Sequence, residues 1–389
     1  MNTDSPVLNA WEKPKISSPN YNMFNKNTRL ILAASTLGLL SSGVDSKAAG
    51  VFSGITGDGT SWEDAGNWDD GIVPVSGAAN TFNIFQNRTA DFDADAWAAV
   101  TKSSVPATLG QYTGITRFFM GESTAGGNNG SHVMNFNPGA GAIMNVTASQ
   151  SGGISTRPGK NGTLNVQSGS LLMGSSTFSI GNVATGAAAN GAINVSGGEL
   201  SFYRAPVTLG NSTAGAVGTG AITVSGGAFT TRTSLTLNST GSFNVVGSNA
   251  TQIGIGAAGT DGNGAWSQAS GATLSMMIDT SVTKIFIEDG SIAGVGSAVF
   301  SAGSILDLGF VGAFANGDYT LMEFENGDID NGVSNDNLLL NSADALAGWS
   351  YRIDNTGANG LLIATFVPEP STALLSFSAL GMLLLRRRR

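Results

Sequence analysis

Aspartate and glutamate outnumber lysine and arginine by 27 to 18, and three of the aspartates alternate along one segment. Asp91, Asp93 and Asp95 would lie on one face of a strand, where their oxygens could ligate Ca²⁺. The residues that follow do not fit a calcium loop, because Ala96 stands where an EF-hand has glycine and Lys102 where it has a bidentate glutamate. The segment therefore favours an acidic face exposed to solvent.

A second acidic group lies in an Asn- and Gly-rich loop and contains Asp328, Asp330 and Asp336. Its glycine is also misplaced for an EF-hand, so a solvated loop is favoured over a calcium site. We predict no metal site and no cofactor.

Catalytic groups of other kinds are scarce. The chain has no cysteine, which excludes disulfides, thiolate zinc sites and cysteine nucleophiles, and its one histidine, His132, has no recognisable motif around it. The acids Glu122, Glu199 and Asp261 are far apart in the sequence, although carboxylates on neighbouring coils of a solenoid could still meet at glycosidase separation. We predict that the protein is not an enzyme and has no catalytic residues; the alternative is a polysaccharide-active β-helix lyase or hydrolase.

Basic residues offer a further option. Arg157, Lys160 and the adjacent pair Tyr203 and Arg204 could form a sugar-contact surface. Solvated loop charges are the simpler interpretation, and the sequence favours it.

These residues are carried by a glycine-rich chain with few charges. Of 389 residues, 55 are glycine, 41% are hydrophobic and 12% are charged. This balance argues against intrinsic disorder, and glycine without a three-residue period argues against collagen. The net charge is −7 over residues 49–100, +3 over 101–270 and −10 over 271–366, so we predict no nucleic-acid partner.

An internal repeat dominates the centre of the chain. The segments 161–169, 190–198 and 219–227 share one pattern, and one constant interval separates each copy from the next. Apolar residues alternate within each copy, which indicates strands with one buried face, and the glycines between strands supply turns with positive φ. A second apolar position recurs in each copy, at Leu171, Leu200 and Phe229.

One such copy cannot bury its own apolar face, whereas copies stacked about 4.8 Å apart pair their backbones and share a core. We therefore predict an all-β fold, a parallel β-helix with Ile193 over Ile222 inside and a polar ladder of Asn165 and Asn194 outside. The alternative is a pair of antiparallel β-sandwiches, which would need hairpin turns and would not explain the constant period.

The two ends of this body differ from its centre. Trp62 and Trp68 are predicted to plug the open end of the stack, in preference to forming a carbohydrate-stacking pair. After residue 296 the repeat fades, and Asn-Gly turns separate runs that predict a C-terminal β-cap with antiparallel pairing. The predicted strands of this cap are 304–309, 319–324, 338–340, 351–354 and 361–367.

The N-terminus has the anatomy of a secretory signal peptide. Lys26 and Arg29 precede an apolar stretch of eleven residues, Leu30–Leu40, and the small residues Ser46 and Ala48 frame a cleavage site after Ala48. Eleven residues are too few to span a hydrocarbon core about 30 Å thick. A buried core helix at 30–40 is the alternative.

The C-terminus combines three features in a fixed order. A Val-Pro-Glu-Pro segment is followed by an apolar stretch, Ser371–Leu385, and then by four arginines. As a helix the stretch would measure roughly 22 Å, a marginal span that snorkelling arginines would extend. The arginines favour the cytoplasmic side, while the signal peptide exports the body, so both ends agree on one topology.

This tail resembles the PEP-CTERM sorting signal of Gram-negative bacteria, from Val367 to the last residue of the sequence, Arg389. A plain tail anchor is the alternative, but it does not need the Pro-Glu-Pro. The resemblance implies recognition by an exosortase-type sorting enzyme, export through the Sec translocon, and association with the envelope or an extracellular polymer matrix. The implied sorting-signal residues are Val367, Pro368, Glu369, Pro370, Arg386, Arg387, Arg388 and Arg389.

The sequence thus predicts an exported structural or adhesive β-solenoid. It would be held at the inner membrane through a C-terminal hydrophobic helix before processing, and then at the cell surface or in the matrix, with extracellular polysaccharide as a partner. The predicted segments are a leader and secretory signal peptide (1–48), an N-terminal β-cap (49–100), solenoid repeats (101–296), a C-terminal β-cap (297–366) and the sorting signal with its transmembrane helix (367–389).

Overall fold

The computed structural model describes fifteen stretches of the chain, all within the compact unit formed by Ser46–Arg389. These stretches are 51–52, 60–68, 82–84, 89–99, 109–115, 118–120, 130–148, 151–256, 264–279, 281–288, 297–311, 316–325, 337–341, 343–344 and 348–367. The predicted signal-peptide cleavage at Ala48, the apolar C-terminal helix and the sorting signal beyond Val367 lie outside the described residues.

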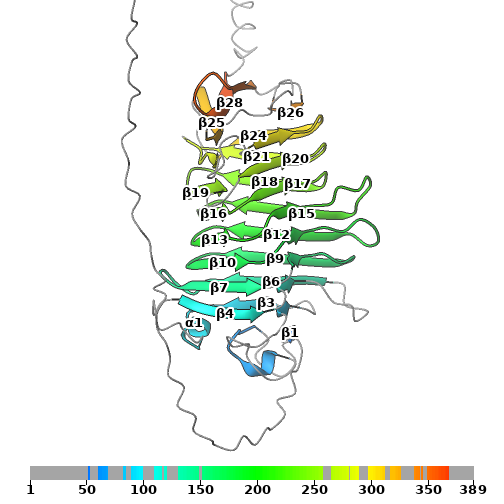
Figure 1. Ribbon diagram of the computed structural model, residues 1–389, viewed down its shortest axis with the longest axis vertical. Helices are drawn as coiled ribbons and strands as arrows, with labels where there is room; N and C mark the ends of the chain where they lie inside the picture. The colour runs from blue at the N-terminus through cyan, green and yellow to red at the C-terminus, as the bar shows by residue number, and fades with distance from the viewer. Residues whose placement is uncertain are drawn as a thin grey trace, which may run out of the picture. The chain divides into compact units, whose positions relative to one another are not determined.

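The strands form three sheets, which we call A, B and C (Figure 1). Sheet A has nine strands, in the order β1 (Val51–Phe52), β2 (Phe82–Ile84), β5 (Phe118–Met120), β8 (Gly152–Ile154), β11 (Phe178–Ile180), β14 (Val207–Leu209), β17 (Ser234–Leu237), β20 (Ala265–Gln268) and β23 (Ser297–Phe300). Sheet B also has nine, in the order β3 (Thr89–Phe92), β6 (Gly130–Phe136), β9 (Lys160–Val166), β12 (Ala189–Val195), β15 (Gly218–Val224), β18 (Gly241–Val246), β21 (Thr273–Ile278), β24 (Ser304–Phe310) and β26 (Leu338–Leu340). Sheet C has ten, in the order β4 (Leu109–Ile115), β7 (Ile143–Ala148), β10 (Ser170–Gly174), β13 (Glu199–Phe202), β16 (Gly227–Thr231), β19 (Ala250–Ile255), β22 (Ile285–Ile287), β25 (Gly317–Phe324), β28 (Gly360–Phe366) and β27 (Trp349–Asp354).

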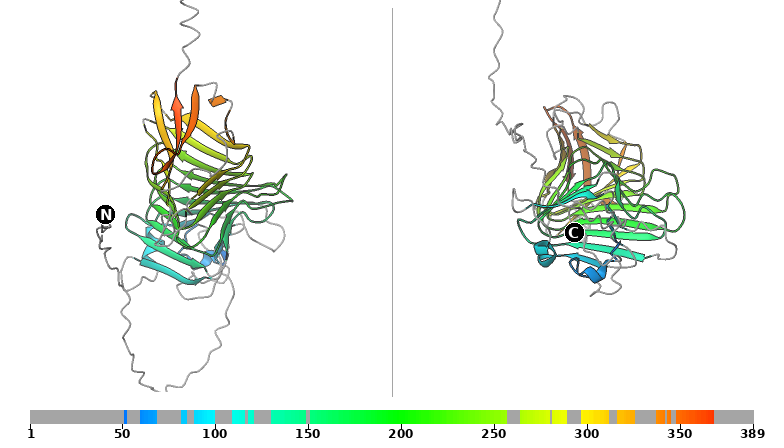
Figure 2. Two further views of the ribbon diagram at one scale, coloured as in Figure 1. Left: turned by 45° about the horizontal axis from the view of Figure 1, so that its top comes forward. Right: turned by 60° about the horizontal axis from the view of Figure 1, so that its bottom comes forward.

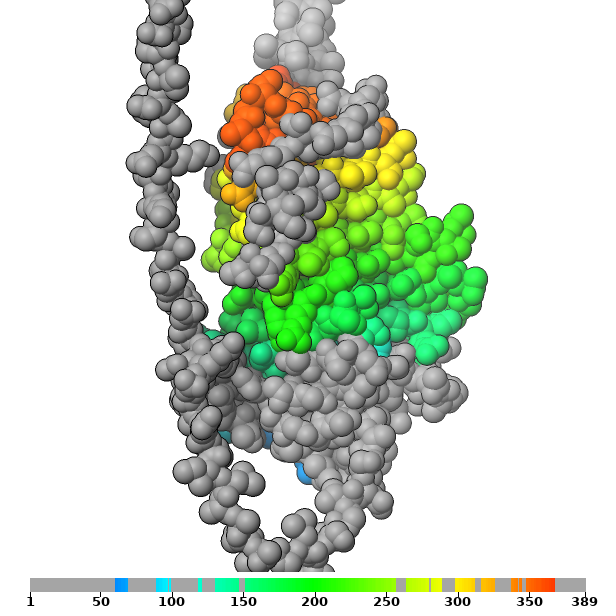
Figure 3. Space-filling view, viewed as in Figure 1, coloured from blue at the N-terminus to red at the C-terminus, as the bar shows by residue number. Residues whose placement is uncertain are grey.

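The chain visits the sheets in rotation, so each coil adds one strand to each sheet. β10, β11 and β12, for example, belong to sheets C, A and B, and each pairs in parallel with the strand three further along the chain. The strands stack as successive rungs when the molecule is viewed from several directions (Figures 1 and 2), and the space-filling view shows the coils lying directly on one another (Figure 3). The predicted parallel β-helix is thus confirmed, and the antiparallel β-sandwich pair is ruled out.

The repeat residues occupy the positions that the constant period of the sequence predicts. Ile193 pairs in register with Leu164 on one side and Ile222 on the other, and the exposed fraction of all three side chains is 0%. The second predicted column is also in register, because Leu200 lies between Leu171 and Phe229. These residues belong to one continuous hydrophobic core, so the alternating aliphatics share a dry interior.

Aromatic rings form a further column inside the stack. Its members are Phe118, Phe178, Phe202, Phe229, Phe243 and Trp266, and their successive ring centroids are 4.8–6.3 Å apart. Separations in this range are typical of favourable aromatic pairs, which contribute beyond the area they bury.

Glycine sets the corner between sheets B and C. Gly169, Gly198 and Gly227 have φ of +68°, +67° and +67°, a conformation that side chains rarely adopt. A Cβ on Gly227 would also lie 2.1 Å from the carbonyl oxygen of Gly198, because successive corners stack directly. The predicted glycine turns are therefore required by both φ and space.

Trp62 and Trp68 lie inside the N-terminal end of the stack, each with an exposed fraction of 3%. Their rings meet edge to face at 4.8 Å, Trp62 packs on Phe92 at 5.5 Å, and the indole N–H of Trp68 donates to the carbonyl of Trp62. They act as a plug, and their burial excludes the carbohydrate-stacking alternative. The short 3₁₀ helix η1 (Ala65–Asn67) and helix α1 (Ala94–Ala99) also lie at this end.

The C-terminal end departs from the parallel pattern in one sheet. β28 pairs antiparallel with both β25 and β27, as expected for the predicted cap, whereas β23, β24 and β26 continue the parallel pairing of sheets A and B beyond residue 296. The five strands predicted here match β24, β25, β26, β27 and β28. Within the described stretches, no helix has both the length and the apolar character needed to cross a bilayer.

Candidate functional site on the outer face of sheet B

A file of polar side chains runs along the outer face of sheet B. It takes one position in or directly after each strand, and on the strands this is the outward residue between two inward apolar residues. The file, which we call the amide ladder, consists of Asp91, Asn135, Asn165, Asn194, Thr223, Asn244, Ser275, Asp307 and Asn341. The predicted pairing of Asn165 with Asn194 is one step of it.

At the N-terminal end of the ladder the hydrogen bonds run in one direction. Each of three amide side chains donates an N–H to the side chain one coil earlier, over 2.7, 2.7 and 2.9 Å. The donors are Asn135, Asn165 and Asn194, and the run of hydrogen bonds ends at the carboxylate of Asp91, which accepts from Asn135. A carboxylate is a strong acceptor, so it fixes the direction of the whole run.

A second carboxylate terminates the ladder near its C-terminal end. Asp307 accepts from the hydroxyl of Ser275 over 3.0 Å and from the amide of Asn341 over 2.9 Å. Between the two ends, the amide of Asn244 donates to the hydroxyl of Thr223 over 3.2 Å. Where these bonds form, the polar side chains hold successive coils in register from outside, while the apolar columns do so from inside.

Two further files run beside the ladder on β9, β12 and β15. The outer one contains Asn161, Asn190 and Thr219, where the hydroxyl of Thr219 donates to Asn190 over 2.6 Å and the backbone N–H of Asn190 donates to Asn161 over 2.8 Å. The file between it and the ladder holds small side chains. We call the outward residues of these strands, together with two outward residues of their neighbour β18, the neutral face: Asn161, Thr163, Asn165, Asn190, Ala192, Asn194, Thr219, Ala221, Thr223, Ser242 and Asn244.

The neutral face carries hydrogen-bonding groups but no charge. A primary amide has two N–H donors and two acceptor lone pairs, and a ladder bond in each direction uses one of each. Each asparagine in the run therefore keeps a donor and an acceptor for water or a ligand. Chemically, the face can bind polar groups along the solenoid axis, and it holds no nucleophile or proton donor of unusual acidity.

Sheet A has a simpler polar file. Ser179, Thr208, Thr236 and Ser267 point outward in register on four successive strands. This file offers one hydroxyl per coil, against two or three polar groups per coil on the neutral face.

Of the predicted sorting-signal residues, only Val367 lies within the described residues. It follows β28 directly, is 62% exposed, and its backbone N–H donates to the carbonyl of Gly348 over 3.0 Å. The positions of Pro368, Glu369, Pro370 and Arg386 to Arg389 lie outside the described residues.

The alternating aspartates do not form a common face. Asp91 belongs to β3 and joins the ladder, whereas Asp93 precedes helix α1 and accepts from the backbone N–H groups of Asp95 and Ala96 over 2.9 and 3.1 Å. The expectation of a strand through Asp95 was wrong, because Asp93 caps a helix here. Among the described residues, no group of three or more His, Asp or Glu side chains is placed to hold a metal ion; Asp328, Asp330 and Asp336 lie outside them.

The basic residues considered for sugar contact are not brought together. Lys160 is only 6% exposed, at an inward position of β9, so it is not part of a surface. Arg157 lies exposed between β8 and β9, at the corner of sheets A and B. Arg204 lies after β13, at the corner of sheets C and A, with its guanidinium 5.7 Å from the ring centroid of Tyr203.

Of the other candidate catalytic groups, the two that the structure describes lie in different sheets, His132 in sheet B and Glu199 in sheet C. His132 is 1% exposed, at an inward position of β6 in register with Gly162. Glu199 accepts from the hydroxyl of Ser170 over 3.0 Å, while Glu122 and Asp261 lie outside the described residues.

Carboxylates with shifted pKa values gather toward the C-terminal end. Burial, together with the charge of Glu325, raises the pKa of Glu288, whereas a hydrogen bond from Lys284 lowers the pKa of Glu323. Burial and the neighbouring Asp307 raise the pKa of Asp344, whose carboxylate accepts the backbone N–H of Leu308. None of these side chains is part of the neutral face.

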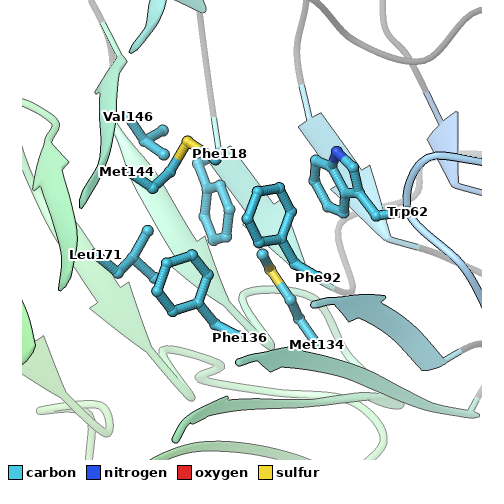
Figure 4. Close-up of a pocket in the computed structure, with 8 residues that line it drawn as sticks. All are labelled: Trp62, Phe92, Phe118, Met134, Phe136, Met144, Val146 and Leu171. Atoms are coloured by element: carbon cyan, nitrogen blue, oxygen red, sulfur yellow. The ribbon is translucent and has the colours of Figure 1, made fainter. Parts of the chain in front are cut away.

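A small void of about 10 Å³ lies in the interior near the N-terminal end (Figure 4). Its lining is entirely apolar and consists of Trp62, Phe92, Phe118, Met134, Phe136, Met144, Val146 and Leu171. A space of this size holds about one water, and a water there would have no polar partner, so the void is a packing defect.

The fold thus defines a parallel β-solenoid whose regular outer faces carry its polar chemistry. No protein-family model matches the sequence, and a search of curated proteins finds no match.

Proposed function

We propose that the protein is an exported, envelope-associated β-solenoid with a structural or adhesive role in an extracellular polymer matrix. The observation that supports this role is the repetition of one polar outer face along one continuous dry core. Such a surface suits a ligand or neighbour that is itself repetitive. A catalytic site, by contrast, concentrates unlike groups at one point.

Stacked coils also suit a mechanical role. In the repeat coils, the backbone of each strand pairs on both sides, and the side chains add an apolar column inside and a hydrogen-bonded ladder outside. Opening one coil would break all three sets of contacts. A scaffold outside the cell benefits from this resistance to unfolding and proteolysis, since proteolysis requires local opening.

The C-terminal tail is proposed to act as a PEP-CTERM sorting signal. The residue that begins it, Val367, is exposed directly after the closing strand β28, which is where a processing enzyme would need access. In the host, an exosortase-type enzyme would recognise the Pro-Glu-Pro segment while the apolar stretch and the arginines hold the protein at the inner membrane.

The test of sorting is the mass of the mature C-terminus in a host that has an active exosortase. We expect a shortened C-terminus for the wild type, and an unprocessed tail for Glu369→Ala and for deletion of Arg386–Arg389. Thr372→Ser, which keeps the Pro-Glu-Pro segment, serves as the control. An intact tail in the mature wild-type protein would contradict the sorting role.

The test of the structural role is retention. We expect the exported protein to co-fractionate with the extracellular matrix, and we expect no release of reducing sugar from a panel of acidic and neutral polysaccharides. Reducing-sugar release that depends on the protein would favour the polysaccharide-active enzyme instead.

A further inference from the structure

We infer that the neutral face binds one chain of a neutral, extended, β-1,4-linked polysaccharide that runs along the solenoid axis. The inference rests on the proposed matrix role and adds to it the binding surface and the class of polymer. It is carried by the spacing, the chemistry and the charge of the face.

The spacing suits a polymer of sugar rings. Neighbouring strands lie about 4.7–4.9 Å apart, and outward residues on one strand lie roughly 6.7 Å apart. The first distance is close to the length of one sugar unit in an extended β-1,4-linked chain, so successive rings would meet successive coils. The spacing between outward residues on one strand places a polar file on each side of the small residues Ala192 and Ala221, which pair in register.

The chemistry of the face complements hydroxyl groups. Each sugar hydroxyl can both donate and accept, and the asparagines of the ladder keep one donor and one acceptor each. Because the ladder bonds already fix these amides, binding would cost little side-chain entropy. The methyl groups of Ala192 and Ala221 offer a small apolar strip between the polar files for the C–H face of a sugar ring.

The charge distribution selects a neutral polymer. The neutral face itself carries no charged side chain, and the carboxylates of Asp91 and Asp307 stand toward the two ends of the same ladder. An acidic polymer running along the axis would be repelled by both carboxylates, and a second copy of this chain would bring like charges together. A neutral chain meets neither penalty, so its binding should change little with salt.

The experiment compares three double variants of the full chain in pelleting assays with amorphous cellulose as the neutral probe and alginate as the acidic one. Ala192→Arg with Ala221→Arg places bulk and charge on the neutral face. Thr208→Arg with Thr236→Arg places the same charge on sheet A and is the matched control. Ala192→Leu with Ala221→Leu blocks the face without charge, and thermal unfolding by circular dichroism verifies the fold of every variant.

We expect the wild type and the sheet A variant to bind cellulose alike, with little change between 50 and 500 mM NaCl, and both neutral-face variants to bind at least tenfold more weakly. The inference is overturned if the neutral-face variants bind as the wild type does, if the wild type binds only alginate or neither polymer, or if sedimentation shows that the neutral face instead joins two copies. Retention of the wild-type protein in the host matrix is measured separately. If the wild type is retained in the matrix but does not bind cellulose, only this inference is refuted. If the wild type is not retained in the matrix, the proposed function is refuted.

Discussion

The repeat coils and the C-terminal end build adjoining parts of sheet C by different means. In the coils, β10, β13 and β16 pair in parallel, and the same residue types recur at each level. At the end, β25, β28 and β27 pair antiparallel and carry contacts that occur once, such as the cluster of Phe310, Trp349 and Phe366. Repetition extends the stack, while unlike residues close it.

Charge follows the same division. The ion pairs of the described residues that involve sheet C strands near the end are Lys284 with Glu323 and Arg352 with Asp318. The side chains of Arg352 and Asp318 are 48% and 50% exposed, so their pair contributes little to stability. A defect in a coil therefore disturbs columns of like residues that recur at each level, whereas a defect in the closing strands disturbs contacts that occur once.

The largest effect on stability is expected when one methyl group is added at a corner glycine of the repeat coils. Gly227→Ala would place a Cβ 2.1 Å from the carbonyl oxygen of Gly198, at φ of +67°, so the backbone of two coils would have to move. We expect a loss of more than about 4–5 kcal/mol in the free energy of unfolding. Urea denaturation followed by circular dichroism measures it.

Gly317→Ala in β25 is the matched control. Gly317 has φ of +148°, but a Cβ there meets nothing within 4 Å, so only the backbone conformation is strained. We expect a loss of about 1–3 kcal/mol. Equal losses in the free energy of unfolding for Gly227→Ala and Gly317→Ala would show that the close stacking of the corners adds nothing to the cost of the substitution.

The next effect comes from the aromatic column. Phe229→Ala removes a ring with 0% exposure between Phe202 and Phe243, and we expect a loss of about 3–5 kcal/mol because neighbouring coils cannot collapse into the space. Phe310→Ala removes a half-buried ring of the closing cluster and should cost less. Thermal denaturation of both variants checks the order, and a larger loss at Phe310 would reverse our account of the two regions.

The fold was predictable because two periodic patterns in the sequence, one within each strand and one between the repeat copies, determine it. Alternation places Leu164, Ile193 and Ile222 inside, and the constant interval between copies places them over one another. The strands of the C-terminal cap were also predictable from Asn-Gly turns and apolar runs. Local chain reversal explains the antiparallel pair of β27 with β28, but not the pair of β25 with β28, because β26 and β27 lie between those two strands in the chain.

The full amide ladder was harder to foresee, because the intervals between its members change outside the repeat. Asn135 follows Asp91 by 44 residues and Asn244 follows Thr223 by 21, so no constant period reveals them. A local signal was present: each ladder residue on a strand is a polar residue between two inward apolar ones, as in Leu306-Asp307-Leu308. The period depends on loop lengths, whereas this triplet depends only on the strand.

Residue type without position gives a wrong prediction for two residues. It predicts a surface position for Lys160, whose side chain points inward from β9, and a strand position for Asp93, which caps helix α1. Charge predicts exposure only on average, and the backbone direction that decides it comes from the coil as a whole.

The smallest predicted effect concerns pH at the closing end. Burial and the neighbouring Asp307 raise the pKa of Asp344 in the folded state, so folding disfavours its charged form. Its contribution to stability is therefore present at low pH and lost as the pH rises through the folded-state pKa. Asp344→Asn keeps an oxygen to accept the N–H of Leu308 and removes the charge, so we expect a gain within about 0.5 kcal/mol at pH 7.

The gain should shrink as the pH falls through the raised folded-state pKa toward the ordinary carboxyl value of about 3.9, below which Asp344 is protonated in both the folded and the unfolded state. Asp354→Asn is the control of opposite sign, because hydrogen bonds from Thr356 lower the pKa of Asp354 in the folded state, and its charged form stabilises the fold above that range. Melting temperatures between pH 7 and pH 3 measure both variants. If Asp344→Asn lowers the melting temperature at pH 7, the charged forms of Asp344 and Asp307 together stabilise the C-terminal end. The repulsion between these two carboxylates, which the uncharged neutral face does not have, would then not destabilise this end.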